Sequence, residues 1–167
     1  MKIENGVLKY LGELVCPHLV FPEDMTDIDD EFYMALGITD DIETIEVEKG
    51  NPFYHSAGNC LIETQTKTLI LGCKNSVIPT DGSVTKIGKF AFNGCQELKR
   101  IEIPKSVTEL GYMSFAYTGL EEVVIPEDLA EIAPHSFSLN RYLEKVIVKK
   151  WGFKITRLLN LVSIVGY

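Results

Sequence analysis

The sequence predicts a mainly β solenoid, in which short parallel strands stack turn upon turn. A seven-residue pattern recurs along the chain, with apolar residues at its first, fourth and sixth positions and proline at its seventh; residues 98–104 and 120–126 are the clearest copies. A second pattern, two aliphatic residues and then an aromatic residue, follows the prolines. The alternation in the first pattern is typical of a pleated strand with one buried face, and internal repeats of this period are typical of solenoids.

The strand pattern occurs six times, which predicts six short strands on one face of the solenoid. Proline follows four of the copies and ends the pairing there, because it has no N–H to donate. The copies are residues 16–21, 42–47, 73–78, 98–103, 120–125 and 143–148.

The returning limb of each turn carries one aromatic ring that we expect in the core. These rings are Tyr33, Phe92, Phe115 and Phe137. The residue before the ring is small in three turns, which lets neighbouring turns approach closely: Ala91, Ser114 and Ser136. Because hydrogen-bonded strands lie ~4.8 Å apart, we expect the rings of Phe92, Phe115 and Phe137 to stack in one column.

One segment, about residues 51–72, interrupts the repeat between its second and third turns. It contains two β-rich runs, residues 60–64 and 68–71, which the polar residues 65–67 connect. Two such runs with a short polar link predict an inserted β-hairpin.

The two ends of the chain depart from the repeat, as terminal units of solenoids commonly do. In the tail, residues 151–167, apolar residues at helical spacing precede a β-branched run, which predicts a short helix and a last strand that cap the core. Residues 3–10 could form a matching strand at the other end. We therefore expect a single domain over residues 1–167, with repeats over 15–150.

Composition and charge narrow the classes of function. Apolar residues make up 46% of the chain and charged residues 24%, which are ordinary globular values. The net charge of -8 argues against a nucleic-acid partner, which needs a positive surface. No apolar stretch approaches the ~20 residues of a membrane-spanning helix, and the first residues lack the apolar core of a secretory signal.

The turn over residues 87–104, with Phe92-Asn93-Gly94-Cys95 and Ile103-Pro104, resembles the repeat of the BspA-like leucine-rich repeat family. Residues 51–71 resemble a hairpin insertion often found in that family. The resemblance implies a right-handed leucine-rich-repeat superhelix with a parallel sheet on one face. It also implies a surface or secreted microbial protein with a role in adhesion, if the chain is a fragment of a typical member; otherwise we expect a cytoplasmic protein.

The four cysteines are expected to be buried, reduced thiols. Cys16 and Cys73 occupy the same slot two turns apart, ~10 Å, beyond the ~7 Å limit for a disulfide. Cys60 and Cys73 flank the hairpin, and a bridge between them stays open as the alternative. No C-x-x-C spacing indicates a zinc site.

No other set of residues indicates catalysis or a cofactor. The three histidines, His18, His55 and His135, lie far apart in sequence and have no motif partner. An acidic run over residues 24–31, with Asp40 and Asp41 nearby, lacks the glycine and the terminal glutamate of a calcium loop, so a solvated loop is expected. We therefore expect no enzyme, no cofactor and no metal.

The outward-facing residues of the predicted strands form the candidate binding site, because solenoids commonly bind through such a face. An ordinary solvated surface is the alternative, with ion pairs between Lys99 or Arg100 and Glu121 or Glu122. The candidate residues are Glu43, Glu46, Lys99, Arg100, Glu102, Glu121, Glu122, Glu144 and Lys145.

These observations favour a noncatalytic protein-recognition or adhesion module, whose partner is a host or cell-surface protein or a glycan. The alternative is a structural spacer, or a terminal fragment of a larger surface repeat protein, with no binding activity of its own. Basic residues in the tail could also form an amphipathic membrane anchor with Trp151 and Phe153, but an end cap is favoured. The basic residues are Lys149, Lys150, Lys154 and Arg157.

Overall fold

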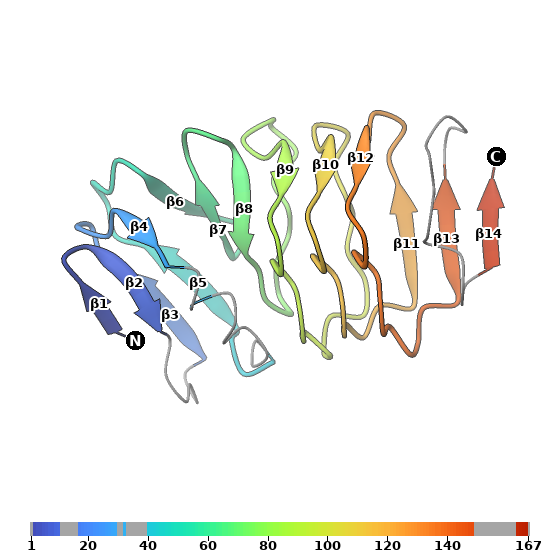
Figure 1. Cartoon of the computed structure of the whole chain (residues 1–167), viewed down its shortest axis with the longest axis horizontal. Helices are drawn as coiled ribbons and strands as arrows, with labels where there is room; N and C mark the ends of the chain where they lie inside the picture. Colours follow the sequence, from blue (N-terminus) through green and yellow to red (C-terminus); the bar gives the residue numbers. More distant parts are fainter. Residues whose placement is uncertain (1, 11–16, 30–31, 33–39, 149–162, 167) are drawn as a thin grey trace.

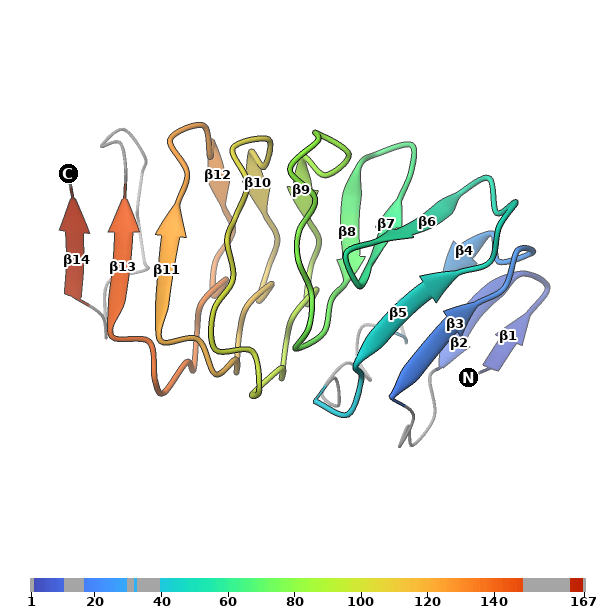
Figure 2. The same cartoon turned by 180° about the vertical axis from the view of Figure 1, so that it is seen from behind.

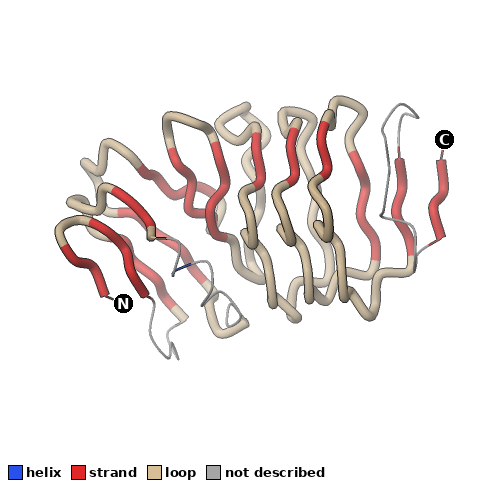
Figure 3. Tube along the Cα trace, in the orientation of Figure 1, coloured by secondary structure: helices blue, strands red, loops and turns tan. Residues whose placement is uncertain are grey.

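The computed structural model describes residues 2–10, 17–29, 32, 40–148 and 163–166, and these residues form the predicted mainly β solenoid. Successive turns stack along the long axis, from the N-terminal strands at one end to the C-terminal strand at the other (Figure 1). Short strands alternate with longer loops in the central turns (Figure 3). No helix in the described part of the chain combines the length and the apolar character that crossing a bilayer requires.

One face of the solenoid carries parallel strands whose register follows the sequence repeat. β3 (His18–Phe21) pairs with β5 (Thr44–Val47), and β11 (Glu122–Ile125) pairs with β13 (Lys145–Val148). Equivalent positions face each other, as Val123 faces Val146. Buried and outward residues alternate along β3 and β11, as the pattern predicts.

Two of the six predicted strands are not strands in the structure. Residues 98–103 make only an isolated bridge, from Glu102 to Val124, and residues 73–78 make no ladder. Within residues 73–78, the hydroxyl of Ser76 accepts a hydrogen bond from the Cys73 N–H (2.8 Å) and donates one to the Asn59 carbonyl (2.6 Å). Serine in the apolar slot thus holds the backbone in a local turn that competes with strand pairing.

The returning limbs form a second sheet, which the insertion extends. β9 (Lys86–Ile87), β10 (Glu109–Leu110) and β12 (Glu131–Ile132) are parallel, and β8 (Thr68–Leu71) joins them beside β9. The predicted hairpin, β7 (Cys60–Glu63) with β8, is confirmed, but β6 (Tyr54–Ala57) adds a third antiparallel strand. Gly58 and Asn59 connect β6 to β7 with positive φ at both residues, as a two-residue hairpin turn requires.

The N-terminal segment forms a hairpin rather than a single strand. β1 (Lys2–Glu4) pairs antiparallel with β2 (Val7–Tyr10), which in turn pairs with β4 (Asp27–Ile28). Asn5 and Gly6 both have positive φ and form the turn. At the other end, β14 (Ser163–Gly166) pairs with β13 and confirms the predicted last strand. The predicted helix and the basic tail lie outside the described residues, as do Cys16 and Tyr33.

The core contains the predicted column of rings. Phe92 and Phe115 stack with ring centroids 5.0 Å apart and an interplanar angle of 5°, and Phe115 stacks on Phe137 at 5.3 Å and 3°. Phe92 and Phe115 are fully buried. The small residues before the rings are buried too: Ala91, Ser114 and Ser136. A second apolar cluster fills the N-terminal turns around Phe21, Met25 and Phe32.

Candidate functional site

The outward side chains of the C-terminal turns form two rows across the sheet face. The first row is charged and contains Arg100, Glu122 and Lys145. The second row is mainly apolar and consists of Val77, Glu102, Val124 and Ile147. Strand pairing sets these rows, because Glu122 faces Lys145 while Val124 faces Glu102 on one side and Ile147 on the other.

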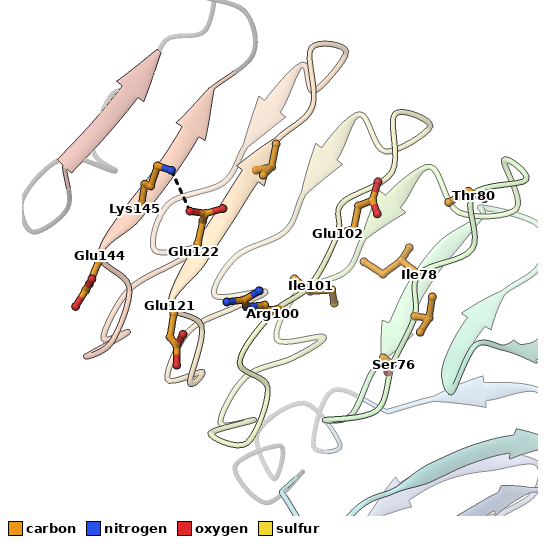
Figure 4. Close-up of a pocket in the computed structure, with 12 residues that line it drawn as sticks. Ser76, Ile78, Thr80, Arg100, Ile101, Glu102, Glu121, Glu122, Glu144 and Lys145 are labelled. Atoms are coloured by element: carbon orange, nitrogen blue, oxygen red, sulfur yellow. Dashed lines mark ion pairs between the residues drawn. The ribbon is translucent and has the colours of Figure 1, made fainter. Parts of the chain in front are cut away.

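A groove of about 620 Å³ runs across these rows (Figure 4). Six of the nine predicted binding residues line it: Arg100, Glu102, Glu121, Glu122, Glu144 and Lys145. The remaining lining comes from the neighbouring turn and from apolar positions between the charges: Ser76, Val77, Ile78, Thr80, Ile101 and Val124. We call this feature the sheet-face groove.

Three of the predicted residues lie outside the sheet-face groove. Glu43 pairs with Lys74 (Oε1–Nζ, 3.7 Å) in the N-terminal half. Glu46 is exposed on β5, where the inserted β6 packs alongside (Figure 2); there the Ser56 hydroxyl accepts from the N–H of Val47 at 3.0 Å. Glu43 thus lies beside the third turn and Glu46 beside the inserted β6, and neither residue lines the groove.

The third of these residues, Lys99, turns away from the sheet face. Its ammonium group lies 5.4 Å from the ring centroid of Tyr142 and donates to the Gln96 carbonyl (3.0 Å). Lys99 occupies the first position after the buried Leu98, where the chain is still leaving the turn. Its side chain therefore points along the edge of the face.

The ion pair on the face differs from the predicted one. Lys145 Nζ lies 3.1 Å from Glu122 Oε2, across neighbouring strands (Figure 4). Glu122 has a basic residue on each side, Arg100 and Lys145, and only the β11–β13 side has a regular ladder that aligns the two side chains. A cross-strand ion pair is therefore present as expected, but its basic partner is Lys145, and the predicted partners Lys99 and Arg100 are wrong.

The sheet-face groove carries an excess of negative charge. Four glutamates line it against one arginine and one lysine. Three of the glutamates form no ion pair with any residue in the described chain: Glu102, Glu121 and Glu144. The same groove is lined by apolar side chains, among them Val77, which is 71% exposed. The groove therefore presents carboxylates beside apolar surface.

The sequence prediction missed the side of the groove that the third turn contributes. Val77 occupies the slot two residues before proline, the position that Glu102 and Val124 hold in their own turns. Counting two residues back from Pro79, as for the outward positions before Pro104 and Pro126, would have found Val77. Thr80 follows that proline and lies outside the repeat pattern, so no signal in the sequence indicates it.

The three cysteines that the structure describes are buried thiols that do not line the groove. Cys60, Cys73 and Cys95 are buried, and Cys60 and Cys73 are not joined by a disulfide. Burial raises the pKa of Cys60 to about 12, and burial also raises the pKa of Cys73. Because the thiolate is the reactive form, both side chains are poor nucleophiles at neutral pH.

Each histidine contacts a hydroxyl, but none of them lines the groove. His18 Nδ1 lies 2.8 Å from Thr44, His55 Nδ1 lies 2.8 Å from Thr64, and His135 Nδ1 lies 3.0 Å from Ser138. These contacts join neighbouring strands or close turns on exposed surface.

The described part of the acidic run is dispersed. Asp27 accepts from the N–H of Ile28, Asp29 pairs with Lys9, and Asp40 accepts from the N–H of Glu97. Among the residues that the structure describes, no three potential metal ligands gather at one point.

Comparison with known proteins gives a family and a fold. Residues 69–157 match the family described as BspA type leucine rich repeat region, in six copies. A search of curated proteins finds no significant match.

Three solved structures resemble the chain at low sequence identity. A leucine-rich repeat protein from Eubacterium ventriosum is 24% identical with a TM-score of 0.66; the match covers 81% of this chain and 37% of that protein. The pneumococcal vaccine antigen PcpA is 16% identical with a TM-score of 0.57 and is matched over 38% of its length by 78% of this chain. A leucine rich cell surface protein from Faecalibacterium prausnitzii is 20% identical with a TM-score of 0.56, with coverages of 81% and 42%. The chain thus spans about two fifths of each of these structures.

Proposed function

Because the chain belongs to the BspA-type leucine-rich repeat family, we propose that it is a noncatalytic protein-recognition module that binds its partner in the sheet-face groove. The observation that carries this proposal is the groove of about 620 Å³ on the face where the outward residues of successive turns converge. Solenoids commonly use such extended concave surfaces for binding. The structural neighbour described as a cell surface protein supports a partner met at the cell surface.

The chemistry of the groove favours a positively charged, extended segment of the partner. Glu102, Glu121 and Glu144 form no ion pair within the described chain, so a lysine or arginine of the partner can pair with them without breaking an existing contact. In the same groove, the exposed side chain of Val77 and the half-buried side chain of Val124 offer apolar surface for a neighbouring aliphatic residue. Complementary charge in such a site sets specificity and association rate more than affinity.

Selection from a displayed random peptide library tests this proposal. The chain is the target, and a Glu102→Lys/Glu144→Lys double variant removes peptides that bind elsewhere. We expect the enriched peptides to carry lysine or arginine beside an aliphatic residue. Calorimetry measures the affinity of these peptides, which should be at least tenfold lower for the double variant. Binding to the unmodified chain should weaken as added salt screens the attraction between the peptide and the glutamates.

Glu46→Lys is the control for net charge, since it reverses one charge on an exposed strand residue outside the groove, and it is compared with the single variants Glu102→Lys and Glu144→Lys. It should leave the peptide affinity within twofold of the unmodified chain. Equal losses in the control and the groove variants would show a response to net charge alone and contradict the proposal. A selection that enriches no peptide over the double variant would overturn it and favour the structural-spacer role.

A further inference from the structure

A second hollow lies at the turns that lead into the strands, outside the sheet-face groove. Its volume is about 170 Å³, below the range of ~300–1,000 Å³ typical of pockets for drug-sized ligands, so it suits a single ring. Both tyrosines that line it are well exposed, Tyr117 at 48% and Tyr142 at 60%. The lining residues are Gln96, Tyr117, Thr118, Leu139, Arg141 and Tyr142.

The backbone at this hollow holds two exposed residues in the left-handed conformation. Gly94, Tyr117 and Leu139 each lie two residues after a core ring, and all three have positive φ, at 79°, 56° and 62°. Glycine adopts this conformation freely, whereas tyrosine and leucine adopt it at a cost. Leu139 is 52% exposed, so neither it nor Tyr117 repays that cost by burial in the core.

Contacts within the chain hold the tyrosine side of the hollow in place. The Lys99 ammonium group lies 5.4 Å from the Tyr142 ring centroid and donates to the Gln96 carbonyl at 3.0 Å. This cation–π contact restrains an otherwise exposed ring. The hollow is therefore partly organised without a ligand.

The backbone donors beside the hollow are already engaged. The N–H of Tyr117 donates to the Ser138 carbonyl (3.1 Å), that of Thr118 to Asn140 Oδ1 (2.6 Å), and that of Gly119 to a carbonyl of the preceding turn (3.2 Å). A peptide that adds to an edge depends on free main-chain groups. The hollow instead offers side chains: tyrosine rings, an amide and a guanidinium group.

The charge of the hollow is opposite to that of the chain. Arg141 is exposed and forms no ion pair with a described residue, and no carboxylate is among the described residues that line the hollow. The chain as a whole carries a net charge of -8. An arginine fork matches a carboxylate in two parallel hydrogen bonds.

We propose that this hollow binds one sugar ring that carries a carboxylate. The apolar face of the ring packs on the tyrosine rings, the carboxylate pairs with Arg141, and the Gln96 amide contacts the ring hydroxyls. This site is separate from the sheet-face groove and does not depend on the function proposed there.

Titration calorimetry of the full chain tests the site with named probes. A hyaluronan tetrasaccharide supplies the carboxylated sugar, chitotetraose a neutral one, and an acetylated Glu-Gly-Glu peptide a carboxylate without a sugar ring. We expect the hyaluronan probe to bind, the neutral probe to bind at least tenfold more weakly, and the peptide not to bind. Tyr142→Ala and Arg141→Gln should each weaken the hyaluronan affinity at least tenfold.

Tyr112→Ala is the matched control, because Tyr112 is a comparably exposed tyrosine (45%) outside the hollow. It should leave the hyaluronan affinity unchanged, and so should the groove variant Glu102→Lys/Glu144→Lys. Thermal melts of each variant confirm folding. Absence of hyaluronan binding, equal binding of the neutral probe, binding of the acidic peptide, or an equal loss in the Tyr112 variant would each overturn the proposal.

Discussion

Replacing the central ring of the column tests how the turns are held together. Phe115 is fully buried and stacks on a ring at each side, at 5.0 and 5.3 Å, whereas Phe137 is 7% exposed and has one stacked neighbour in the described column. Phe→Ala in a core costs roughly 3–5 kcal/mol, and each aromatic pair adds about 0.5–1.5 kcal/mol beyond burial. We therefore expect Phe115→Ala to lower the free energy of unfolding by about 5 kcal/mol and Phe137→Ala by about 1 kcal/mol less.

Equilibrium urea unfolding, followed by far-UV circular dichroism, measures both values. Because domains have only about 5–15 kcal/mol of stability in total, Phe115→Leu provides a milder change that keeps most of the volume. It should cost roughly 1–2 kcal/mol. A loss under about 1 kcal/mol for Phe115→Ala, or a larger loss for Phe137→Ala, would refute the stacked column as the main link between turns.

Three further substitutions probe other parts of the structure. Asn140→Ala removes a side chain that makes four hydrogen bonds within the described chain; urea unfolding should show a loss of about 2–4 kcal/mol, and a loss under 1 kcal/mol would contradict its role. Tyr117→Gly removes the cost of about 1–2 kcal/mol that a non-glycine residue has in the left-handed conformation, while the greater entropy of glycine in the unfolded chain costs about 0.5–1 kcal/mol. Thermal unfolding should therefore show equal or higher stability. Burial raises the pKa of the Cys60 thiol from 9.0 to about 12 in the folded chain. The protonated thiol therefore contributes fully to stability below pH 9, and this contribution falls by up to ~1.4 kcal/mol per pH unit above it. Urea midpoints between pH 8 and 11 should therefore fall less steeply in Cys60→Ala, and equal slopes would contradict this effect of burial.

The sequence predicted the repeat because each turn must satisfy the same packing. Among the described residues, the slots that recur before the prolines are buried except for the partly buried Ile101, and the rings at 92, 115 and 137 stack as the period requires. The predictions that were wrong or incomplete concern local hydrogen bonding. A hydroxyl at Ser76 formed a turn in place of a strand, and positive φ at Asn5-Gly6 and Gly58-Asn59 produced two hairpins. Both dipeptides are recognised turn signals, so a closer inspection of turn chemistry could have found them.

The candidate site was predictable in part for the same reason. Strand alternation identified which side chains point outward, and most of the predicted charges line the sheet-face groove. The pattern could not show that β6 packs beside β5 near Glu46, because that contact joins the repeat to an insertion. It also could not indicate the hollow at Tyr117 and Tyr142, since these residues are exposed and follow no apolar period.

Methyl NMR with the library-selected basic peptide tests most directly whether the sheet-face groove is the recognition site. Val77, Ile101 and Val124 line the groove, and Val20 is an exposed control residue on the N-terminal strands. We expect the methyl signals of the three groove residues to shift and saturate together during the titration while those of Val20 stay in place. Saturating shifts at Val20 or in residues 54–63, with the groove methyl groups unmoved, would contradict it.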